Sequence, residues 1–421
     1  MSSEFGDNVS TTAIAPAAPP RKKQLLWWGD SPSAATGFGT VSRNVLAAIH
    51  ATGEWDITVR AVNGYGQRHQ YPYTLLPAGY PEPDPFGRKA FVRDLYGEPA
   101  FDLVVLNNDV YVVDELAPEL AQLAEKGYPA RTIFYYPVDC SLPPGMTNLI
   151  DTVTMPVAYS TFGQAETAKR TSRPVAVIPH GCEAIPKLTA DERRKFRRDA
   201  FLVDRDETLV WVTVQRNSMR KDVARTIEAF AAFKKFQPDS RLYVHCQPQD
   251  NGLDMQAAAR EAGVESSVAF PAQFSLSSGG MPRDMLMRVL QLGDGFVTTH
   301  LGEGWGLTVT EAMSAGVPVV APSNTTMPEI LGASYPYLYP CRDTVWVDNS
   351  GFRPRGLLRD IFQAMKRCHD ERGTPAQAEQ IAKAHEFTKA VSWEAVGKMW
   401  LKLIEHTMAQ PVFVKKLAEA V

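Results

Sequence analysis

Short apolar runs rich in β-branched and aromatic residues alternate with longer amphipathic stretches along the chain. This alternation is typical of parallel sheets covered by helices on both faces. In the first half the runs predict strands at residues 24–28, 101–106, 132–136, 153–159 and 175–178. In the second half they predict strands at residues 209–214, 242–246, 268–270, 295–299 and 317–321. The pattern therefore predicts an α/β chain with two similar halves.

The segment 179–187 (PHGCEAIPK) separates the two halves, and its prolines and glycine interrupt both periodicities. We expect a hinge there, since 421 residues suit two domains of ~150–200 residues better than one core. The predicted domains are residues 24–180 and 188–390, preceded by a flexible tail at 1–23 that is rich in Ala, Pro, Ser and Thr. From residue 391 onward apolar residues recur at helical spacing, with Trp393 and Trp400 on one face, which predicts a packing helix.

Composition narrows the class of protein. A net charge of −3 argues against a broad basic surface for nucleic acid. The five cysteines lie far apart without a CxxC pair, so neither a disulfide framework nor a zinc site is indicated. The chain has no run of 18 apolar residues, and its first 23 residues lack the apolar segment of a signal peptide. We therefore expect a cytoplasmic protein without a transmembrane segment.

The stretch 299–331 (THLGEGWGLTVTEAMSAGVPVVAPSNTTMPEIL) carries the clearest functional signal. It follows a predicted strand, opens with glycines and enters a predicted helix at about Leu307 that ends at Gly316. In an open parallel sheet such a turn lies at the carboxyl edge, where ligands bind, and the free N–H groups of the helix start favour an anion. A diphosphate would fit this position.

Charged residues flank this turn. Glu303 and Glu311 could accept hydrogen bonds from hydroxyl groups on either side of a bound phosphate, as a nucleotide sugar offers them; the alternative is a solvated loop residue and a charge at a helix N-terminus. Upstream, Arg216 and Lys221 lie near the start of the next predicted helix and could neutralise a departing diphosphate. Either cation alone would more often be a surface charge, but the four residues together describe a site.

Residues 303–320 (EGWGLTVTEAMSAGVPVV) closely resemble the Glu-seven-Glu signature of the family-four retaining glycosyltransferases, the glycosyl transferases group 1. The segment with Arg216 and Lys221 resembles the phosphate-binding pair of that family. The resemblance extends from about residue 25 to 408 and is strongest over 205–331. It implies a GT-B fold, in which two Rossmann-like domains face a deep cleft, the second domain holds the donor, and the C-terminal helix (391–421) crosses back to the first.

The resemblance also implies residue roles. Glu303 would bind the donor sugar, Glu311 the ribose, and Arg216 and Lys221 the diphosphate. The phosphate cradle and nucleobase site would be completed by Gly306, Leu307 and Thr308 and by the segment 272–274, which ends at Phe274. The family often has a Gly-Gly-x-Pro-Glu run where this chain has SNTTMPEI at 323–330, so only Pro328 and Glu329 match there.

Several residues of the first half are candidates for the other side of the cleft. Gly37 and Gly39 form a glycine turn before a helix predicted at 41–49, matching in position the loop that the family uses at the diphosphate; a tight structural turn is the alternative. Asp139 follows a predicted strand where many relatives carry a His, with a cap as the alternative. Weaker candidates are Asn107, Asn108 and Asp109 for the acceptor, and His180 and His300, of which His300 ranks higher because it lies near Glu303.

The resulting hypothesis is a retaining, metal-independent glycosyltransferase that moves a hexose-type sugar from a UDP- or GDP-sugar to an unidentified hydroxyl acceptor: glycan, lipid, protein or modified nucleobase. No cofactor and no metal-ligand cluster are expected. The alternatives are a nucleotide-sugar epimerase or phosphorylase on the same fold, and a non-catalytic nucleotide-sugar-binding protein. The basic helix 191–199 (DERRKFRRD) reads as a solvated face, with a peripheral contact to an anionic membrane or acceptor as its alternative.

Overall fold

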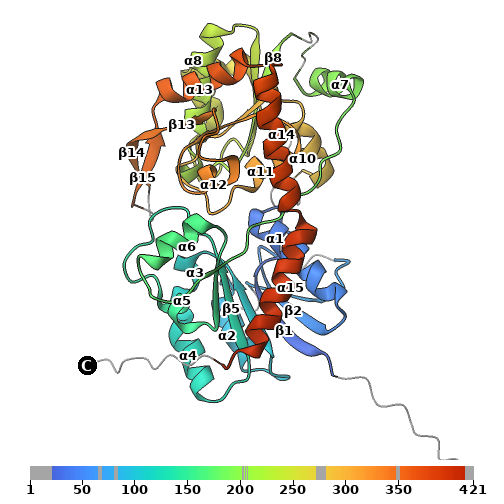
Figure 1. Cartoon of the computed structure of the whole chain (residues 1–421), viewed down its shortest axis with the longest axis vertical. Helices are drawn as coiled ribbons and strands as arrows, with labels where there is room; N and C mark the ends of the chain where they lie inside the picture. Colours follow the sequence, from blue (N-terminus) through green and yellow to red (C-terminus); the bar gives the residue numbers. More distant parts are fainter. Residues whose placement is uncertain are drawn as a thin grey trace, which may run out of the picture.

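The computed structural model describes residues 21–64, 69–79, 84–201, 203, 205, 207–271, 281–347 and 351–412. Two parallel α/β units lie one above the other along the longest axis (Figure 1). The predicted tail at 1–23 lies almost wholly outside the described residues. The predicted fold class, two parallel α/β domains, is confirmed.

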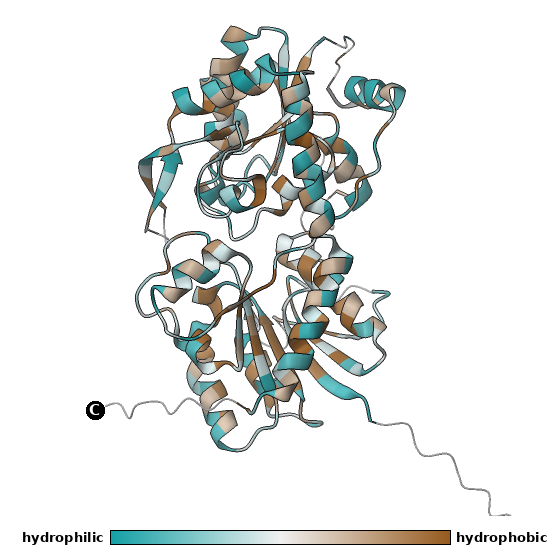
Figure 2. Cartoon of the chain, in the orientation of Figure 1, coloured by the Kyte–Doolittle hydropathy of each residue, from teal (hydrophilic) through white to brown (hydrophobic). Residues whose placement is uncertain are grey.

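The first sheet has the strand order β3-β2-β1-β4-β5-β6-β7, and its described pairs are all parallel. Its central strands are largely hydrophobic, as Figure 2 shows. β4 is buried throughout and β5 over its last four residues, because helices cover both faces. The strands are β1 (Lys23–Asp30), β2 (Trp55–Val62), β3 (Thr74–Pro77), β4 (Leu103–Asn107), β5 (Arg131–Tyr136), β6 (Met155–Ala158) and β7 (Ala176–Val177). The helices include α1 (Gly37–Ala51), α2 (Arg88–Leu95), α3 (Val110–Val113), α4 (Ala117–Glu125), α5 (Asn148–Thr152) and α6 (Thr161–Ala168).

The second sheet has the order β10-β9-β8-β11-β12-β13, again parallel. The chain order reverses at β1/β4 in the first sheet and at β8/β11 in the second, and such switch points are where parallel sheets bind ligands. The strands are β8 (Leu209–Val214), β9 (Ser240–His245), β10 (Val268–Ala269), β11 (Gly295–Val297), β12 (Val319–Pro322) and β13 (Leu338–Tyr339). The helices are α7 (Ala190–Phe201), α8 (Val223–Phe236), α9 (Met255–Glu261), α10 (Arg283–Leu290), α11 (Leu307–Ser314), α12 (Met327–Leu331) and α13 (Leu358–Asp370).

Each strand predicted from the sequence is present, with its ends shifted by at most two residues. Strands β2, β3 and β13 were not predicted. An antiparallel hairpin was also missed: β14 (Cys341–Val347) pairs with β15 (Gly351–Gly356) between β13 and α13. This hairpin stands apart from the second sheet and extends toward the first unit (Figure 1).

Two helices at the C-terminal end of the described chain connect the units. α14 (Pro375–Ala390) packs on α11 of the second unit, and α15 (Trp393–Ala409) packs on α1 of the first. The passage between them lies beside the predicted hinge, where the Cys182 amide donates to the Val391 carbonyl at 2.8 Å. The chain therefore crosses between the units at two adjacent places, as Figure 1 shows.

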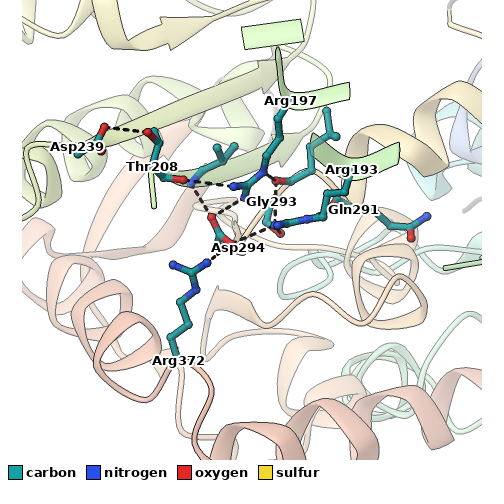
Figure 3. Close-up of polar contacts among 10 residues, drawn as sticks. Arg193, Arg197, Thr208, Asp239, Gln291, Gly293, Asp294 and Arg372 are labelled. Atoms are coloured by element: carbon teal, nitrogen blue, oxygen red, sulfur yellow. Dashed lines mark hydrogen bonds and ion pairs between the residues drawn. The ribbon is translucent and has the colours of Figure 1, made fainter. Parts of the chain in front are cut away.

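The basic helix α7 is not simply a solvated face, which corrects the expectation for 191–199. Arg197 is only 2% exposed, and its Nη2 lies 2.6 Å from the Asp294 carboxylate (Figure 3). Arg193 and Arg372 reach the other oxygen of Asp294 at 3.0 and 2.9 Å. Buried arginines need such partners, so these contacts fasten α7 to the loop before β11. Arg194, Lys195 and Arg198 are exposed.

Candidate active site

Polar side chains gather where the carboxyl ends of the central strands of the two sheets face each other. Asp30 ends β1, Asn107 ends β4 and Asp139 follows β5 in the first unit. Lys221 follows β8 and Glu303 follows β11 in the second. The two sets meet: Asp139 of the first unit lies 3.1 Å from Arg220 Nε of the second. The site therefore lies between the units, at the switch points of both sheets.

Glu303 is buried between two cations. One of its carboxylate oxygens accepts a hydrogen bond from Lys221 Nζ, and the other lies 3.4 Å from Arg220 Nη1. Burial alone would raise the pKa of Glu303, but the Lys221 and Arg220 charges outweigh it and hold that pKa below its usual range. Burial lowers the pKa of Lys221 even though Glu303 opposes the shift. The structure thus brings the predicted pair Glu303 and Lys221 into direct contact.

Arg220 is a central residue that the sequence analysis missed. Its Nη1 donates to the Gly302 carbonyl at 2.7 Å, so it joins the loop after β11 to Asp139. Burial lowers its pKa, but the carboxylates of Asp139, Glu303 and Asp109 more than reverse this. The sequence offered one signal for Arg220, its position just before Lys221. That signal is not sufficient, because the backbone conformation of the turn determines whether both side chains enter the site.

The turn that presents Arg220 and Lys221 is held from three sides. Asp222 adopts a left-handed conformation with φ 46°, and both of its carboxylate oxygens accept hydrogen bonds from Arg355 at 2.7 and 2.9 Å. The Thr299 hydroxyl donates to the Asp222 carbonyl at 2.8 Å. The Leu301 amide donates to the Arg220 carbonyl at the same distance. The two cations therefore sit on a fixed backbone.

The predicted cation Arg216 lies apart from this cluster. Its Nε is 2.8 Å from Asp250, and its side chain is 55% exposed. The hydrogen bond with Asp250 raises the pKa of Arg216, and the charge of Asp30 across the site contributes. Arg216 is thus the more exposed cation at the rim of the site, while Arg220, whose side chain is 30% exposed, lies beside Glu303.

Two helix N-termini lie next to each other across the units. α11 begins after Gly306, whose φ is 111° and which, as a glycine, offers no side-chain cap to the amides of Leu307 and Thr308 in the first turn. A Cβ on Gly37 in α1 would lie 3.5 Å from Leu307. Both ends carry partial positive charge, which favours a bound anion.

The predicted glycine turn before 41–49 is wrong in detail, because α1 already begins at Gly37. Thr36 caps the helix by accepting from the Gly39 amide at 2.9 Å, and a Cβ on Gly39 would come within 2.4 Å of the Ala34 carbonyl. Gly37 and Gly39 therefore form the first helical turn. Thr36 also donates to Asp30, which links this turn to β1.

Glu311 lies in α11 and is 2% exposed. One of its oxygens accepts from Arg283 at 2.5 Å, and the other is buried without a protein partner within the described structure. Burial raises the pKa of Glu311, and the Arg283 charge opposes this. Arg283 also lies 3.3 Å from Glu183 in the predicted hinge. Glu311 is thus neither solvated nor a simple helix-end charge.

The two candidate histidines are both buried, whereas the candidate nucleobase segment is not described. His300 is 1% exposed, and burial lowers its pKa to about 4; His180 packs against Tyr159 at 4.2 Å, and burial lowers its pKa to about 3. Phe274 and the rest of 272–274 lie outside the described residues.

Asn107, Asn108 and Asp109 end β4 on the side of the site. Asn107 is fully buried and accepts from the Tyr159 hydroxyl at 2.6 Å. Asn108 accepts from the Asp109 amide at 2.9 Å. Asp109 itself stands at the N-cap of α3 without a capping hydrogen bond. Burial and the nearby charge of Asp139 raise the pKa of Asp109 to about 6.

Neither a metal centre nor a membrane-spanning helix is found among the residues that the structure describes. Within the described ranges, no group of three or more His, Cys, Asp or Glu side chains is arranged to hold a metal ion. Among the helices described, none is both long and apolar enough to cross a membrane.

Comparison with known proteins gives the class. Residues 194–344 match the family model of glycosyl transferases group 1. The alpha-monoglucosyldiacylglycerol synthase of Streptococcus pneumoniae is 27% identical over 153 residues, 35% of this chain and 32% of that protein. The chain thus spans about a third of the length of the curated relative it matches.

Solved structures resemble nearly the whole chain. A glycosyltransferase from Rickettsia africae has a TM-score of 0.69 at 13% identity, with 93% of this chain and all of that one covered. A sucrose-phosphate synthase from Thermosynechococcus elongatus also has 0.69, at 17% identity and 92% and 100% coverage. HepE from Anabaena, solved with UDP and glucose, has 0.67 at 16% identity and 91% and 100% coverage.

The fold is of the GT-B type, with two Rossmann-like domains, as predicted. The predicted resemblance is confirmed within that fold, since residues 194–344 match the family model of the glycosyl transferases group 1.

Proposed function

We propose that the protein is a glycosyltransferase that uses a nucleotide diphosphate sugar as donor. The observation that carries the proposal is the buried contact of Glu303 with Lys221 and Arg220, directly before the uncapped N-terminus of α11. Cations and helix amides that lie together can bind a diphosphate, and a carboxylate beside them can accept hydrogen bonds from the hydroxyl groups of a sugar. The HepE structure with UDP and glucose supports this class of donor.

In this proposal the chain acts mainly by stabilising the leaving group. Lys221 and Arg220 neutralise the charge that develops on the departing diphosphate, with help from the amides of Leu307 and Thr308 and the facing start of α1. Glu303 holds the donor sugar, and the unpartnered oxygen of Glu311 accepts from a ribose hydroxyl. Arg216, at the rim, adds positive charge for the donor as it enters.

The finer features of the reaction are proposals as well. We propose transfer of a hexose-type sugar with retention, by attack on the face that the diphosphate leaves, so that a phosphate oxygen takes the acceptor proton. Asp139 suits a positioning role, because each of its carboxylate oxygens is already in an ion pair. We propose turnover without a metal ion and a cytoplasmic location.

The test is product-resolved mass spectrometry of the purified protein with a panel of UDP-, GDP- and ADP-sugars. We expect release of one nucleotide and, in the Lys221→Ala variant, turnover lower by ~10²-fold or more, because comparable charge-stabilising groups contribute that much. Glu303→Ala should lose activity similarly. Lys383→Ala, which removes an exposed lysine paired with Glu379, is the matched control and should retain wild-type turnover.

The same panel separates the alternatives. An epimerase would convert the donor sugar without an acceptor, and a phosphorylase would require phosphate. A binding protein would bind a nucleotide sugar in calorimetry and release nothing. Near-full turnover in Lys221→Ala would contradict the assigned site, and loss of turnover with a chelator would contradict metal independence.

A further inference from the structure

The hairpin β14–β15 contributes a side chain to the other unit of the protein. Arg353 in β15 is 4% exposed, and both ends of its guanidinium contact Asp139, which follows β5 of the first unit. Nη1 donates to the Asp139 carbonyl at 2.8 Å, and Nη2 lies 2.9 Å from one carboxylate oxygen. A planar guanidinium that makes two hydrogen bonds fixes the orientation of its partner as well as its charge.

The other carboxylate oxygen of Asp139 belongs to the site. It lies 3.1 Å from Arg220 Nε, and Arg220 in turn contacts the Gly302 carbonyl and Glu303. Arg353, Asp139, Arg220 and Glu303 thus form one unbroken series of ion pairs, from the hairpin through the first unit to the proposed donor site. Asp139, Arg220 and Glu303 each lie between two opposite charges, so a shift of one side chain changes the position of the next.

The hairpin has a second anchor on the same face. Arg355 stands two residues after Arg353, so both side chains leave the same side of β15, and Arg355 binds Asp222 through both carboxylate oxygens. Asp222 directly follows Lys221. The hairpin therefore binds two loops. Arg355 holds the turn that carries Arg220 and Lys221, and Arg353 holds the loop of the first unit that carries Asp139.

The loop before α11 and the loop after β5 also pack closely against each other without the help of Arg353. A Cβ on Gly302 would lie 1.9 Å from the Asp139 carbonyl, and one on Gly304 would lie 2.4 Å from Pro137. The loop before α11 and the loop after β5 are thus in backbone contact, with Arg353 Nη1 only 3.1 Å from that same Gly302 position. Arg353 therefore packs against both loops where they meet, at Gly302 and at the Asp139 carbonyl.

We propose that Arg353 is a positioning residue for the reaction: it fixes the Asp139 carboxylate so that Arg220 is aimed at the leaving diphosphate when the units are together. This inference rests on the proposed function for its effect on rate, whereas the contact itself can be measured without any sugar transfer. Arg353 touches no reacting atom, so its loss changes turnover through Asp139 and Arg220.

The experiment compares Arg353→Gln, Arg353→Lys and the matched control Arg342→Gln, which removes an exposed arginine from the other strand of the hairpin. A misplacement of about 1 Å can cost ~10²-fold in rate, so we expect Arg353→Gln to lose turnover on that scale. A lysine makes one of the two contacts at a time, so Arg353→Lys should be intermediate. Circular dichroism melting confirms that each variant is folded.

A double-variant cycle tests the route of the effect. If Arg353 acts through Asp139, Asp139→Asn combined with Arg353→Gln loses no more turnover than the more damaged of the two single variants. Losses that multiply, or wild-type turnover in Arg353→Gln, would overturn the proposal.

Hydrogen exchange in the peptide 137–142 provides the readout that needs no catalysis. Exchange should be faster in Arg353→Gln than in Arg342→Gln, because the Asp139 loop loses its two contacts. Equal exchange in the two variants would refute the positioning contact itself. Faster exchange combined with a wild-type protein that transfers no sugar would refute the proposed function and leave the contact standing.

Discussion

At the scale of single residues, Asp109 differs from its neighbour Asp139. Asp139 is held by two arginines, whereas Asp109 has no ion pair within the described structure and does not cap α3, although it stands at the helix start. Burial and the charge of Asp139 raise its pKa from 3.8 to about 6. Such a carboxylate destabilises the folded state when it is ionised.

The raised pKa gives a stability prediction with a defined sign. Between pH 4 and 6 the unfolded chain has already released the Asp109 proton while the folded protein keeps it, so the contribution of Asp109 to stability falls as pH rises through this range. Asp109→Asn should therefore raise the melting temperature at pH 7.5 and leave it unchanged at pH 3.5. Asp56→Asn, at an exposed position of β2, is the control. A variant that melts lower than wild type at pH 7.5 would contradict the assignment.

The sequence predicted part of this site, and the reason is local. Glu303 and Lys221 stand in turns that directly follow strands, so the rule for parallel sheets places them at the ligand edge. Arg353 could not be found this way, since it contacts a residue 214 positions away and its strand carries no motif. Arg220 was missed because two adjacent cations in a sequence do not reveal that the turn brings both side chains into the site.

At the scale of elements, the helix α15 stabilises the first domain from outside its own segment of chain. Trp400 in α15 is fully buried, with its ring 5.7 Å from that of Trp27 in β1 and 5.0 Å from that of Tyr135 in β5. Replacing a buried Trp by Ala typically costs 3–5 kcal/mol. We expect about that loss in the free energy of unfolding for Trp400→Ala in urea denaturation.

The neighbouring Met399 provides the control for this helix, because it lies in the same turn and is 41% exposed. Met399→Ala should change the unfolding free energy by less than ~0.5 kcal/mol. Equal losses in the two variants would mean that the helix responds to substitution in general and that the contact with Trp27 and Tyr135 is unimportant.

Elements with regular apolar spacing were the ones the sequence predicted well. The buried strands β4, β5 and β8 stand out as continuous apolar runs, and Trp393 and Trp400 mark one face of α15. The hairpin β14–β15 is mostly exposed or half-buried and has no such run. In α7 the composition is overwhelmingly charged, and only the position of Asp294 in the folded chain shows that Arg197 is buried.

At the scale of the whole molecule, polar contacts between the two domains lie on more than one side of the site. Besides Arg353 and Asp139, Glu329 of α12 accepts from the Thr161 hydroxyl at 2.7 Å and from the amides of Thr161 and Phe162 at 3.1 and 3.2 Å. Its carboxylate thus sits at the N-terminus of α6, where negative charge is favoured. These contacts hold the domains together around the adjacent crossings at Cys182 and Val391.

Domain motion about these crossings gives the last prediction. Hydrogen bonds to a charged group contribute ~1.5–3 kcal/mol, which corresponds to roughly a 10- to 100-fold shift in an equilibrium between open and closed arrangements. Glu329→Ala should therefore increase the radius of gyration of the free protein in small-angle X-ray scattering. Saturating UDP, which we expect to bind between the domains, should restore the smaller value.

Glu379→Ala, on the exposed side of α14, removes a carboxylate that bridges no domains and should scatter like wild type with and without UDP. Scattering of Glu329→Ala and wild type distinguishes whether backbone packing or polar contacts keep the two domains closed. If Glu329→Ala and wild type scatter alike in the absence of UDP, the backbone contacts of Gly302 and Gly304 with the Pro137–Asp139 loop suffice for closure, and the polar contacts only set its geometry. If Glu329→Ala opens and UDP closes it again, ligand and Glu329 stabilise the same arrangement, because a ligand shifts an equilibrium only toward the state it binds better.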